Sequence, residues 1–216
     1  MTRKPIGPLV LFAALLSCGA LLSGCDAMAY MLYMISPRNA DVEAEYEALN
    51  EGSVAIVVYA DQATEYEYFD VRRSVSMTVL GELERRVEGV EIIDPARVVR
   101  YQDENIYWDE MPKTQLGKAL GADFILFISL LEFSTREPGS LNLYRGRITA
   151  QVGLFKTALA ERQARVWYAR EVRVRYPEND PTGELSESDR KIRERTEQKF
   201  ADKLAKKFYD HEVPIE

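Results

Sequence analysis

Apolar runs of strand length alternate with segments of helical spacing through the first part of the chain. Residues 53–60 are almost continuously apolar, which is typical of a strand buried on both faces, and residues 90–94 and 122–131 repeat this pattern. Between the first two runs, apolar side chains recur at every fourth position in residues 69–87, which predicts an amphipathic helix. Residues 112–120 predict another helix. This part of the chain therefore predicts strands that alternate with helices.

The pattern changes in the second half of the chain. Apolar side chains alternate with polar or small ones in residues 148–154 and in residues 166–176, which predicts two long strands. Residues 157–163 connect these strands into a hairpin. Residues 184–209 carry an apolar stripe at helical spacing, with acids near the start and lysines near the end, as the helix dipole favours. This last segment predicts a long amphipathic helix.

The order of these elements predicts an α/β fold in a single domain over residues 40–216. Three parallel strands with right-handed crossover helices, followed by the long antiparallel hairpin, would form a mixed five-stranded sheet. The amphipathic helix would close the domain. A short Glu-rich helix over residues 40–50, stopped by Gly52, would begin it.

The N-terminal segment has the pattern of an export signal. Arg3 and Lys4 precede an uncharged apolar stretch over residues 9–22, and two small residues and Cys25 end it. A cysteine directly after a small pair resembles the lipobox of bacterial lipoproteins. That resemblance implies a diacylglyceryl group on the Cys25 thiol, cleavage between Gly24 and Cys25, and acylation of the new amino terminus, with palmitate as an expected acyl chain.

The N-terminal segment also allows three alternatives. The stretch from Pro5 to Cys25 could be a membrane span, although it contains Gly and Pro and is only about the length that a span requires. Cys25 could be an ordinary apolar residue, or Cys18 could be the acylated one. The bulky Leu16 precedes that cysteine where a small residue is preferred. The lipoprotein interpretation makes residues 1–24 a signal peptide.

Residues 25–39 would then be a lipidated tether. Its apolar first part would either pack on its own domain or lie at the bilayer surface beside the acyl chains. The protein would be anchored to a membrane of the cell envelope and face the periplasm. Asp26 resembles the signal that retains enterobacterial lipoproteins in the inner membrane, so the inner membrane is the expected one.

Composition narrows the possible chemistry. The 216 residues carry 28 basic and 35 acidic side chains, a net charge of −7, and loss of Arg3 and Lys4 with the signal would leave 26 basic and 35 acidic side chains, a net charge of −9. An acidic chain lacks the basic footprint of a nucleic-acid binder, so we expect no nucleic acid partner. Both cysteines lie within residues 1–25, so the expected domain has no thiol chemistry and no disulfide.

The sequence offers weak support for catalysis. His211 is the only histidine and lies near the C-terminus, where a solvated side chain is the ordinary expectation. The acidic pairs Asp103/Glu104 and Asp109/Glu110 lie in polar segments, and such carboxylates are usually solvated. No glycine-rich phosphate loop occurs. We therefore expect a protein that is not an enzyme and that holds no metal or cofactor.

Three segments resemble a broad group of bacterial envelope lipoproteins and domains. These segments are residues 54–58, residues 91–94, and the run Leu-Gly-Ala-Asp-Phe-Ile-Leu at 120–126. The group includes the curli secretion channel lipoprotein, activator lipoproteins of penicillin-binding proteins and the amino-terminal domain of the TolB protein. The resemblance covers about residues 53–175 and implies accessory and assembly roles. In the Leu-Gly-Ala-Asp turn, Gly121 would take the positive φ of a helix C-cap.

Aromatic side chains follow each of the three predicted parallel strands. Ligands of open α/β sheets bind outside the carboxyl ends of parallel strands, so these segments would share one edge. Aromatic and arginine side chains are also enriched at protein interfaces. The edge would either dock a partner protein or cover the ends of the core. Its candidate residues are Tyr66, Tyr68, Phe69, Arg72, Tyr101, Tyr107, Trp108, Phe133 and Arg136.

A second candidate surface is a basic face of the hairpin. A turn centred near Ala160 would place Arg147 opposite Arg173 and Arg145 opposite Arg175, and like charges in that position are unfavourable. Their cover would come from inside the chain or from external anions such as lipid headgroups or cell-wall polymer. The internal candidates are Glu43, Glu45 and Glu47.

The expected function is that of a lipid-anchored, non-enzymatic assembly or accessory module of an envelope or secretion complex. The partners would be the membrane, through the acyl chains, and an envelope protein. The alternative is a solute- or cell-wall-polymer-binding lipoprotein that uses the same loop edge.

Overall fold

The computed structural model describes residues 39–140, 143–178 and 188–214. These residues belong to two compact units, one of residues 43–211 and one that contains the strands at the two ends of the described chain. Gly24, Cys25, Asp26 and the tether as far as residue 38 lie outside the described residues, so the predictions made for them stay predictions.

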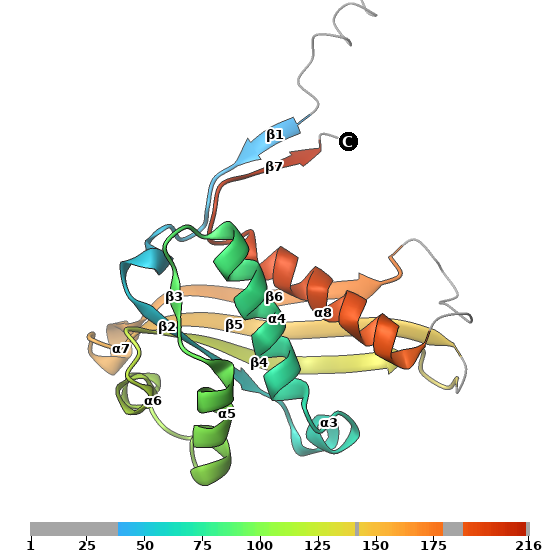
Figure 1. Ribbon diagram of the computed structural model, residues 1–216, viewed down its shortest axis with the longest axis horizontal. Coiled ribbons are helices and arrows are strands. Elements are labelled where there is room, and N and C mark those ends of the chain that lie inside the picture. The colour runs from blue at the N-terminus through green and yellow to red at the C-terminus, as the bar shows by residue number, and fades with distance from the viewer. Residues whose placement is uncertain (1–38, 141–142, 179–187, 215–216) are drawn as a thin grey trace, which may run out of the picture. The chain divides into compact units, whose positions relative to one another are not determined.

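The larger unit contains a mixed five-stranded sheet with the order β3-β2-β4-β5-β6 (Figure 1). β2 pairs in parallel with β3 and β4, whereas β4, β5 and β6 pair antiparallel. This arrangement confirms the predicted fold class. The strands are β2 (Ser53–Tyr59), β3 (Glu91–Ile92), β4 (Phe124–Arg136), β5 (Tyr144–Lys156) and β6 (Arg165–Tyr176).

Six α-helices and one short 3-10 helix accompany the sheet within the described residues. Local sequence explains several of their ends. Asp94 accepts a hydrogen bond from the amide of Ala96 and Pro95 occupies the first turn of α5, while Ser188 accepts one from the amide of Lys191 at the start of α8. The helices are η1 (Ala48–Glu51), α3 (Gln62–Glu67), α4 (Val71–Arg86), α5 (Pro95–Glu104), α6 (Lys113–Leu120), α7 (Glu161–Ala164) and α8 (Asp189–Ala205).

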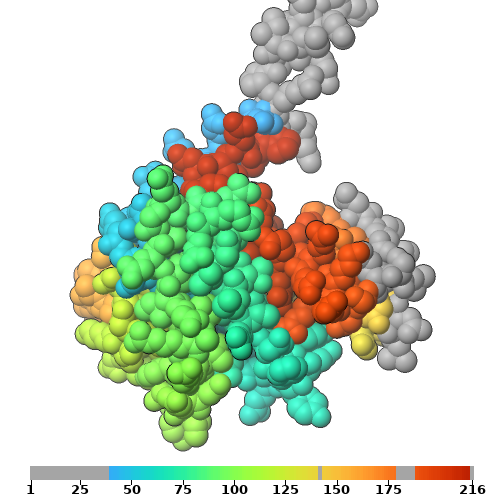
Figure 2. Space-filling model, viewed as in Figure 1, coloured from blue at the N-terminus to red at the C-terminus, as the bar shows by residue number. Residues whose placement is uncertain are grey.

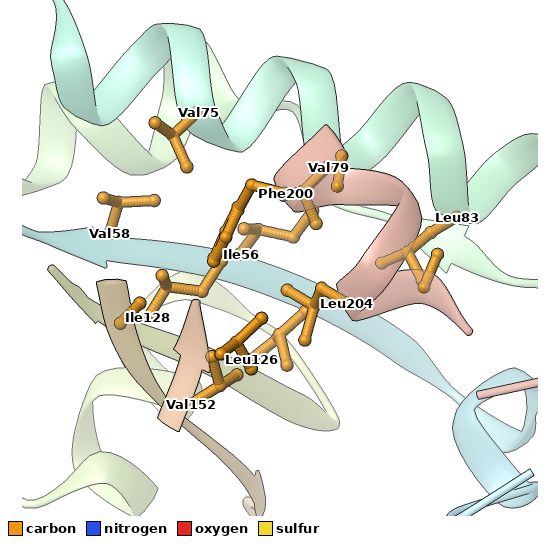
Figure 3. Packing of buried hydrophobic residues seen from close by; sticks show 14 of the residues in the cluster. Ile56, Val58, Val75, Val79, Leu83, Leu126, Ile128, Val152, Phe200 and Leu204 are labelled. Carbon is orange, nitrogen blue, oxygen red and sulfur yellow. The ribbon is translucent and has the colours of Figure 1, made fainter. Parts of the chain in front are cut away.

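Helices α4 and α8 pack side by side on one face of the sheet and enclose the main core (Figure 3). Val79 of α4 and Phe200 of α8 meet the strand residues Ile56, Leu126 and Val152, and all five are fully buried. Each such side chain contributes about 1.5–3 kcal/mol through burial. The four-residue apolar spacing of α4 therefore marks the stripe that faces the sheet.

Helices α5 and α6 cover the other face of β2 and of the first half of β4. Val57 and Ile125 project to this side and pack with Leu116 of α6 and Val98 of α5. The strand β2 is thus buried on both faces, as its continuous apolar run predicts.

The Leu-Gly-Ala-Asp turn joins α6 to β4. Gly121 has a φ of 72°, in the left-handed region, and ends the helix. The Asp123 carboxylate then accepts hydrogen bonds from both the amide and the hydroxyl of Ser53, each 2.9 Å long, at the start of β2. These bonds fix the beginnings of the two parallel strands beside each other and lower the pKa of Asp123.

Two local predictions were wrong. Residues 40–50 do not form the predicted helix, and only their last residues belong to a helix, the 3-10 helix η1. This short acidic sequence buries only Leu49, and the amides of Glu45 and Tyr46 donate to the carbonyl of Lys207 instead. The second parallel strand is not a buried strand. β3 has two residues, is exposed or half-buried, and lies at the edge of the sheet, where only β2 pairs with it.

The described residues of the smaller unit belong to a two-stranded sheet. β1 (Asn39–Val42) pairs with β7 (His211–Pro214), so the segment that follows the predicted tether lies beside the C-terminal strand. The amide of the Asn39 side chain donates a 2.7 Å hydrogen bond to Glu212. Most of these residues are exposed.

Candidate functional site

Four large apolar side chains are exposed at the end of the sheet where β2 terminates. We call Tyr66, Phe69, Ile106 and Tyr107 the apolar edge; their exposed fractions are 93%, 89%, 82% and 72%. The first two belong to α3 and to the turn before α4, and the other two follow α5. Figures 1 and 2 place both segments at the lower end of the domain as drawn. Ile106 is not among the residues that the sequence predicts for this edge.

Arg72 connects the two segments that carry the apolar edge. Its guanidinium lies 2.9 Å from the Glu65 carboxylate of α3 and 2.7 Å from the Asp103 carboxylate of α5. The arginine itself is on α4. One half-buried cation therefore ties three helices together, and its charge is used inside the domain.

Other aromatic residues of the predicted edge belong to the core. Trp108 is 7% exposed, and its ring centroid lies 6.1 Å from that of Tyr59 and 6.4 Å from that of Phe127. The ring of Tyr68 meets Phe133 edge-on at 4.8 Å. Trp108, Tyr68 and Phe133 thus take the alternative role, in which rings close the end of the core.

The remaining members of the predicted edge are held by local contacts. Tyr101 is half-buried and its hydroxyl lies 3.6 Å from the sulfur of Met111. Arg136 is the last residue of β4, 3.6 Å from Asp189, with its guanidinium over the ring of Tyr144. β4 is longer than the predicted strand, so Phe133 and Arg136 lie within it and not in a following loop.

Charges around the apolar edge are mainly acidic. Residues 61–73 and 100–113 together carry eight acidic and four basic side chains. Of the four bases, Arg72 is already paired with two carboxylates, and Lys113 is half-buried over the Phe127 ring, where desolvation lowers its pKa. The apolar edge is therefore surrounded by net negative charge.

The hairpin register differs from the predicted one by two residues in its outer half. Arg147 faces Arg175, and Arg173 faces Thr149. Irregularities between Ala150 and Val152 and after Leu154 cause the shift. In this outer half, a shift of two keeps each side chain on its predicted face, because the side-chain period of a strand is two. Nearer the turn the shift is one residue, and Leu154 faces Trp167 instead of Val166. Trp167 is therefore buried, and Tyr168 is 44% exposed.

An internal carboxylate covers the buried end of the arginine face. Arg145 is 5% exposed and lies 3.5 Å from Glu137, which also forms an ion pair with Arg147. The predicted partners of these arginines were different ones, Glu43, Glu45 and Glu47. Glu45 accepts hydrogen bonds from Trp167 and Lys207 instead. Within the described residues, Glu43 and Glu47 make no ion pair with these arginines.

Arg173 and Arg175 belong to a different surface, a groove of about 570 Å³ between the edge strand β6 and helix α8. We call it the basic groove. Two carboxylates, Glu178 and Asp202, share its lining with five cations. The cations are Arg173, Arg175, Lys199, Lys203 and Lys206.

Contacts in the basic groove join α8 to the edge of the sheet. The ammonium of Lys203 donates a 3.0 Å hydrogen bond to the carbonyl of Arg173, and that of Lys199 approaches the carbonyl of Arg175 at 3.5 Å. Lys199 also pairs with Glu178 at 2.6 Å, which lowers the pKa of that carboxyl group. The lysines thus cap backbone acceptors that an exposed edge strand would otherwise present.

A third group of polar residues lies between α4 and α8. Arg193 contacts Asp70 at 2.8 Å, Ser74 at 2.6 Å and Glu197 at 2.9 Å, and the Ser74 hydroxyl donates to Glu197. Burial raises the pKa of Glu197. These groups pair with one another between the two helices and connect them.

The described part of the chain shows neither a metal centre nor a membrane-spanning helix. Over those residues, no three or more histidine, cysteine, aspartate or glutamate side chains come together in a way that could hold a metal ion. No helix there combines the length and the apolar character needed to cross a bilayer.

Comparisons with known proteins give distant structural likenesses. A PelC dodecamer from Paraburkholderia phytofirmans is 12% identical, with a TM-score of 0.41, and the match covers 77% of this chain and 98% of that one. The lipoprotein GNA1162 from Neisseria meningitidis is 14% identical, with a TM-score of 0.38, and the match covers 59% of this chain and 85% of that one. No family model matches the chain, and no curated protein matches it. At this level of similarity neither structure assigns a family or a function.

Proposed function

We propose that this protein is a lipid-anchored accessory module of the cell envelope, without enzymatic activity, that docks a partner protein on its apolar edge. The exposure of Tyr66, Phe69, Ile106 and Tyr107 at one end of the domain carries this proposal. The four side chains form two exposed pairs, on two segments that Arg72 joins. Large exposed apolar side chains that share one end of a domain are candidate anchors for a partner, whereas scattered single ones are ordinary. The Cys25 lipobox supplies the anchor.

The setting of the apolar edge favours a protein partner over a lipid bilayer. Eight acidic side chains against four basic ones lie in the segments that carry it. Anionic headgroups would repel this surface, because membrane-surface segments are typically basic. A partner with apolar anchors inside a basic rim complements it, and such complementarity guides association.

The anchor is tested by Cys25→Ser in the full chain. We expect the wild-type protein to incorporate labelled palmitate and to sediment with membranes, and the variant to do neither. Cys18→Ser is the matched control and should leave both properties unchanged. If palmitate labelling survived in the Cys25 variant and disappeared in the Cys18 variant, Cys18 would be the acylated cysteine.

Docking is tested by photo-cross-linking in the producing cells. A photoreactive residue at position 69 or 107 should give the same discrete adduct. Leu131, which is 57% exposed on β4 and outside the apolar edge, is the control position and should not give it. Adducts that are equally strong at all three positions, or absent at 69 and 107, would contradict the proposal. Because labelling and cross-linking are independent, the anchor and the docking surface can fail separately.

A further inference from the structure

The basic groove concentrates positive charge in an acidic chain. Five cations and two carboxylates line it, whereas the whole chain carries a net charge of −7. Its two walls come from regular elements, since β6 is the edge strand of the sheet and α8 runs alongside it (Figure 1). The groove lies entirely within residues 43–211, so one compact unit builds it.

Three cations of the basic groove are available to a ligand. Lys206 pairs with Asp202 at 2.8 Å, and Arg173, whose side chain is 64% exposed, pairs with Glu171 at 3.0 Å. Exposed pairs of this kind contribute little and exchange readily for a stronger anion. The Arg175 side chain makes no ion pair within the described residues. A ligand with several negative groups could therefore engage several cations at once.

The chemistry of the walls disfavours three modes of anion binding. Strand addition by an acidic peptide is hindered, because lysines already occupy the carbonyls of Arg173 and Arg175. Among the described lining residues no aromatic ring is present to stack nucleic-acid bases. Val174 is the sole apolar member of that set and is 9% exposed, so the walls offer no surface for acyl chains.

We propose that the basic groove binds an acidic polysaccharide through the carboxylates of successive sugar units. Such a polymer needs neither an aromatic platform nor an apolar wall, only fixed cations along its path. The guanidinium groups of Arg173 and Arg175 can each bind a carboxylate in a bidentate manner, and the ammonium of Lys203 supplies a further charge between the walls. This site is distinct from the apolar edge and does not depend on docking there.

The test is calorimetric titration of the full chain, in detergent, with oligogalacturonate at low salt. Arg173→Gln combined with Arg175→Gln should weaken binding about tenfold, because two charge-assisted contacts are lost. The control combines Arg162→Gln with Arg190→Gln, which removes the same charge from exposed positions outside the groove. It should bind as the wild type does. Affinity should also fall steeply as NaCl is raised.

A second variant tests the other wall. Lys206→Gln leaves β6 and the contacts of Lys199 and Lys203 with its carbonyls unchanged. It should also weaken binding, with a melting temperature close to that of the wild type. Equal affinities for the groove and control variants, or no binding by the wild type at low salt, would overturn the proposal. Tighter groove-dependent binding of polyphosphate or of phosphatidylglycerol vesicles would replace the polysaccharide with a phosphate ligand.

Discussion

The apolar edge and the basic groove present opposite chemistry on one domain. The apolar edge consists of exposed rings and an isoleucine in short segments after β2 and α5, within acidic surroundings. The basic groove consists of cations on a strand and a helix, with a single apolar residue in the described lining. The first surface suits a protein with apolar anchors and the second suits a polar polyanion. The two proposed binding surfaces therefore differ in chemistry as well as in position on the fold.

The two surfaces also differ in how the chain supports them. Exposed members of the apolar edge lie directly beside core residues, for example Tyr107 beside Trp108, so neighbours in sequence have different roles. The lysines of the basic groove hold backbone carbonyls that lie 24 and 30 residues away along the chain, as Lys203 holds that of Arg173. We therefore expect a mutation in the apolar edge to act only at its own position. A mutation of a lysine that holds a carbonyl in the basic groove should also affect the placement of α8.

The largest expected effect separates core from surface at the apolar edge. Trp108→Ala should lower the free energy of unfolding by about 3–5 kcal/mol, because it leaves a cavity against Tyr59 and Phe127. Tyr107→Ala should change it by less than about 0.5 kcal/mol. Urea denaturation measures both. A small loss for Trp108→Ala would mean that this ring belongs to the docking surface after all.

A smaller effect is expected where α8 approaches the sheet. A Cβ added at Gly146 would overlap the Thr196 hydroxyl oxygen, so Gly146→Ala should destabilise the domain by about 1–3 kcal/mol and displace α8. Oligogalacturonate binding should weaken with it, since α8 is one wall of the groove.

Gly81→Ala is the matched control for that substitution. It lies in α4 with no atom within 4 Å of the added Cβ, and it should stabilise the domain by about 0.5–1 kcal/mol. Thermal melting and calorimetry of both variants give the comparison. Unchanged stability in Gly146→Ala would show that the helix and the sheet are less closely packed than the structure indicates.

The smallest effect concerns the pH dependence of the core beneath the apolar edge. Burial raises the pKa of Tyr68, whose hydroxyl also accepts a hydrogen bond from the amide of Thr135. Because the folded-state pKa lies above that of the unfolded chain, the unfolded state loses its proton first as the pH rises. Tyr68 therefore contributes stability that is present below the ordinary tyrosine pKa and lost through the alkaline range above it.

Tyr68→Phe should remove the part of the alkaline loss of stability that comes from Tyr68. At neutral pH it should lower the free energy of unfolding by about 1 kcal/mol, because a hydrogen bond is missing. Tyr66→Phe, at an exposed position, should change neither quantity. Denaturation midpoints at neutral and alkaline pH measure the difference. Identical alkaline curves for wild type and Tyr68→Phe would contradict the assignment.

The periodic parts of the chain predicted most of the fold. The apolar run of β2, the four-residue spacing of α4 and the alternation in β5 and β6 all correspond to elements of the structure. In β2 and α4 the pattern directly reflects which faces are buried, whereas in β6 the irregular register buries Trp167 and leaves Tyr168 44% exposed. The helix predicted for the acidic segment 40–50 was wrong except for its last residues, which belong to η1. Charged residues favour several conformations until a contact such as that with Lys207 selects one.

The candidate sites were less predictable. Aromatic residues after the strands indicated an edge, but nothing in the local sequence distinguishes Tyr107 from Trp108, since exposure depends on which ring meets Tyr59 and Phe127. Ile106 could not be predicted as a member, because an isolated isoleucine in a polar segment carries no signal of exposure.

Local patterning was sufficient to specify the α/β class, the parallel strands and the long hairpin, because burial periodicity is a local property of the sequence. The basic groove was not visible at that level. The lysines of α8 have a sufficient local explanation in the helix dipole, and alternation alone places the arginines of β6 on a face of the sheet. Only the packing of α8 against the edge of the sheet brings these charges together, because that contact joins parts of the chain whose patterns carry no information about each other.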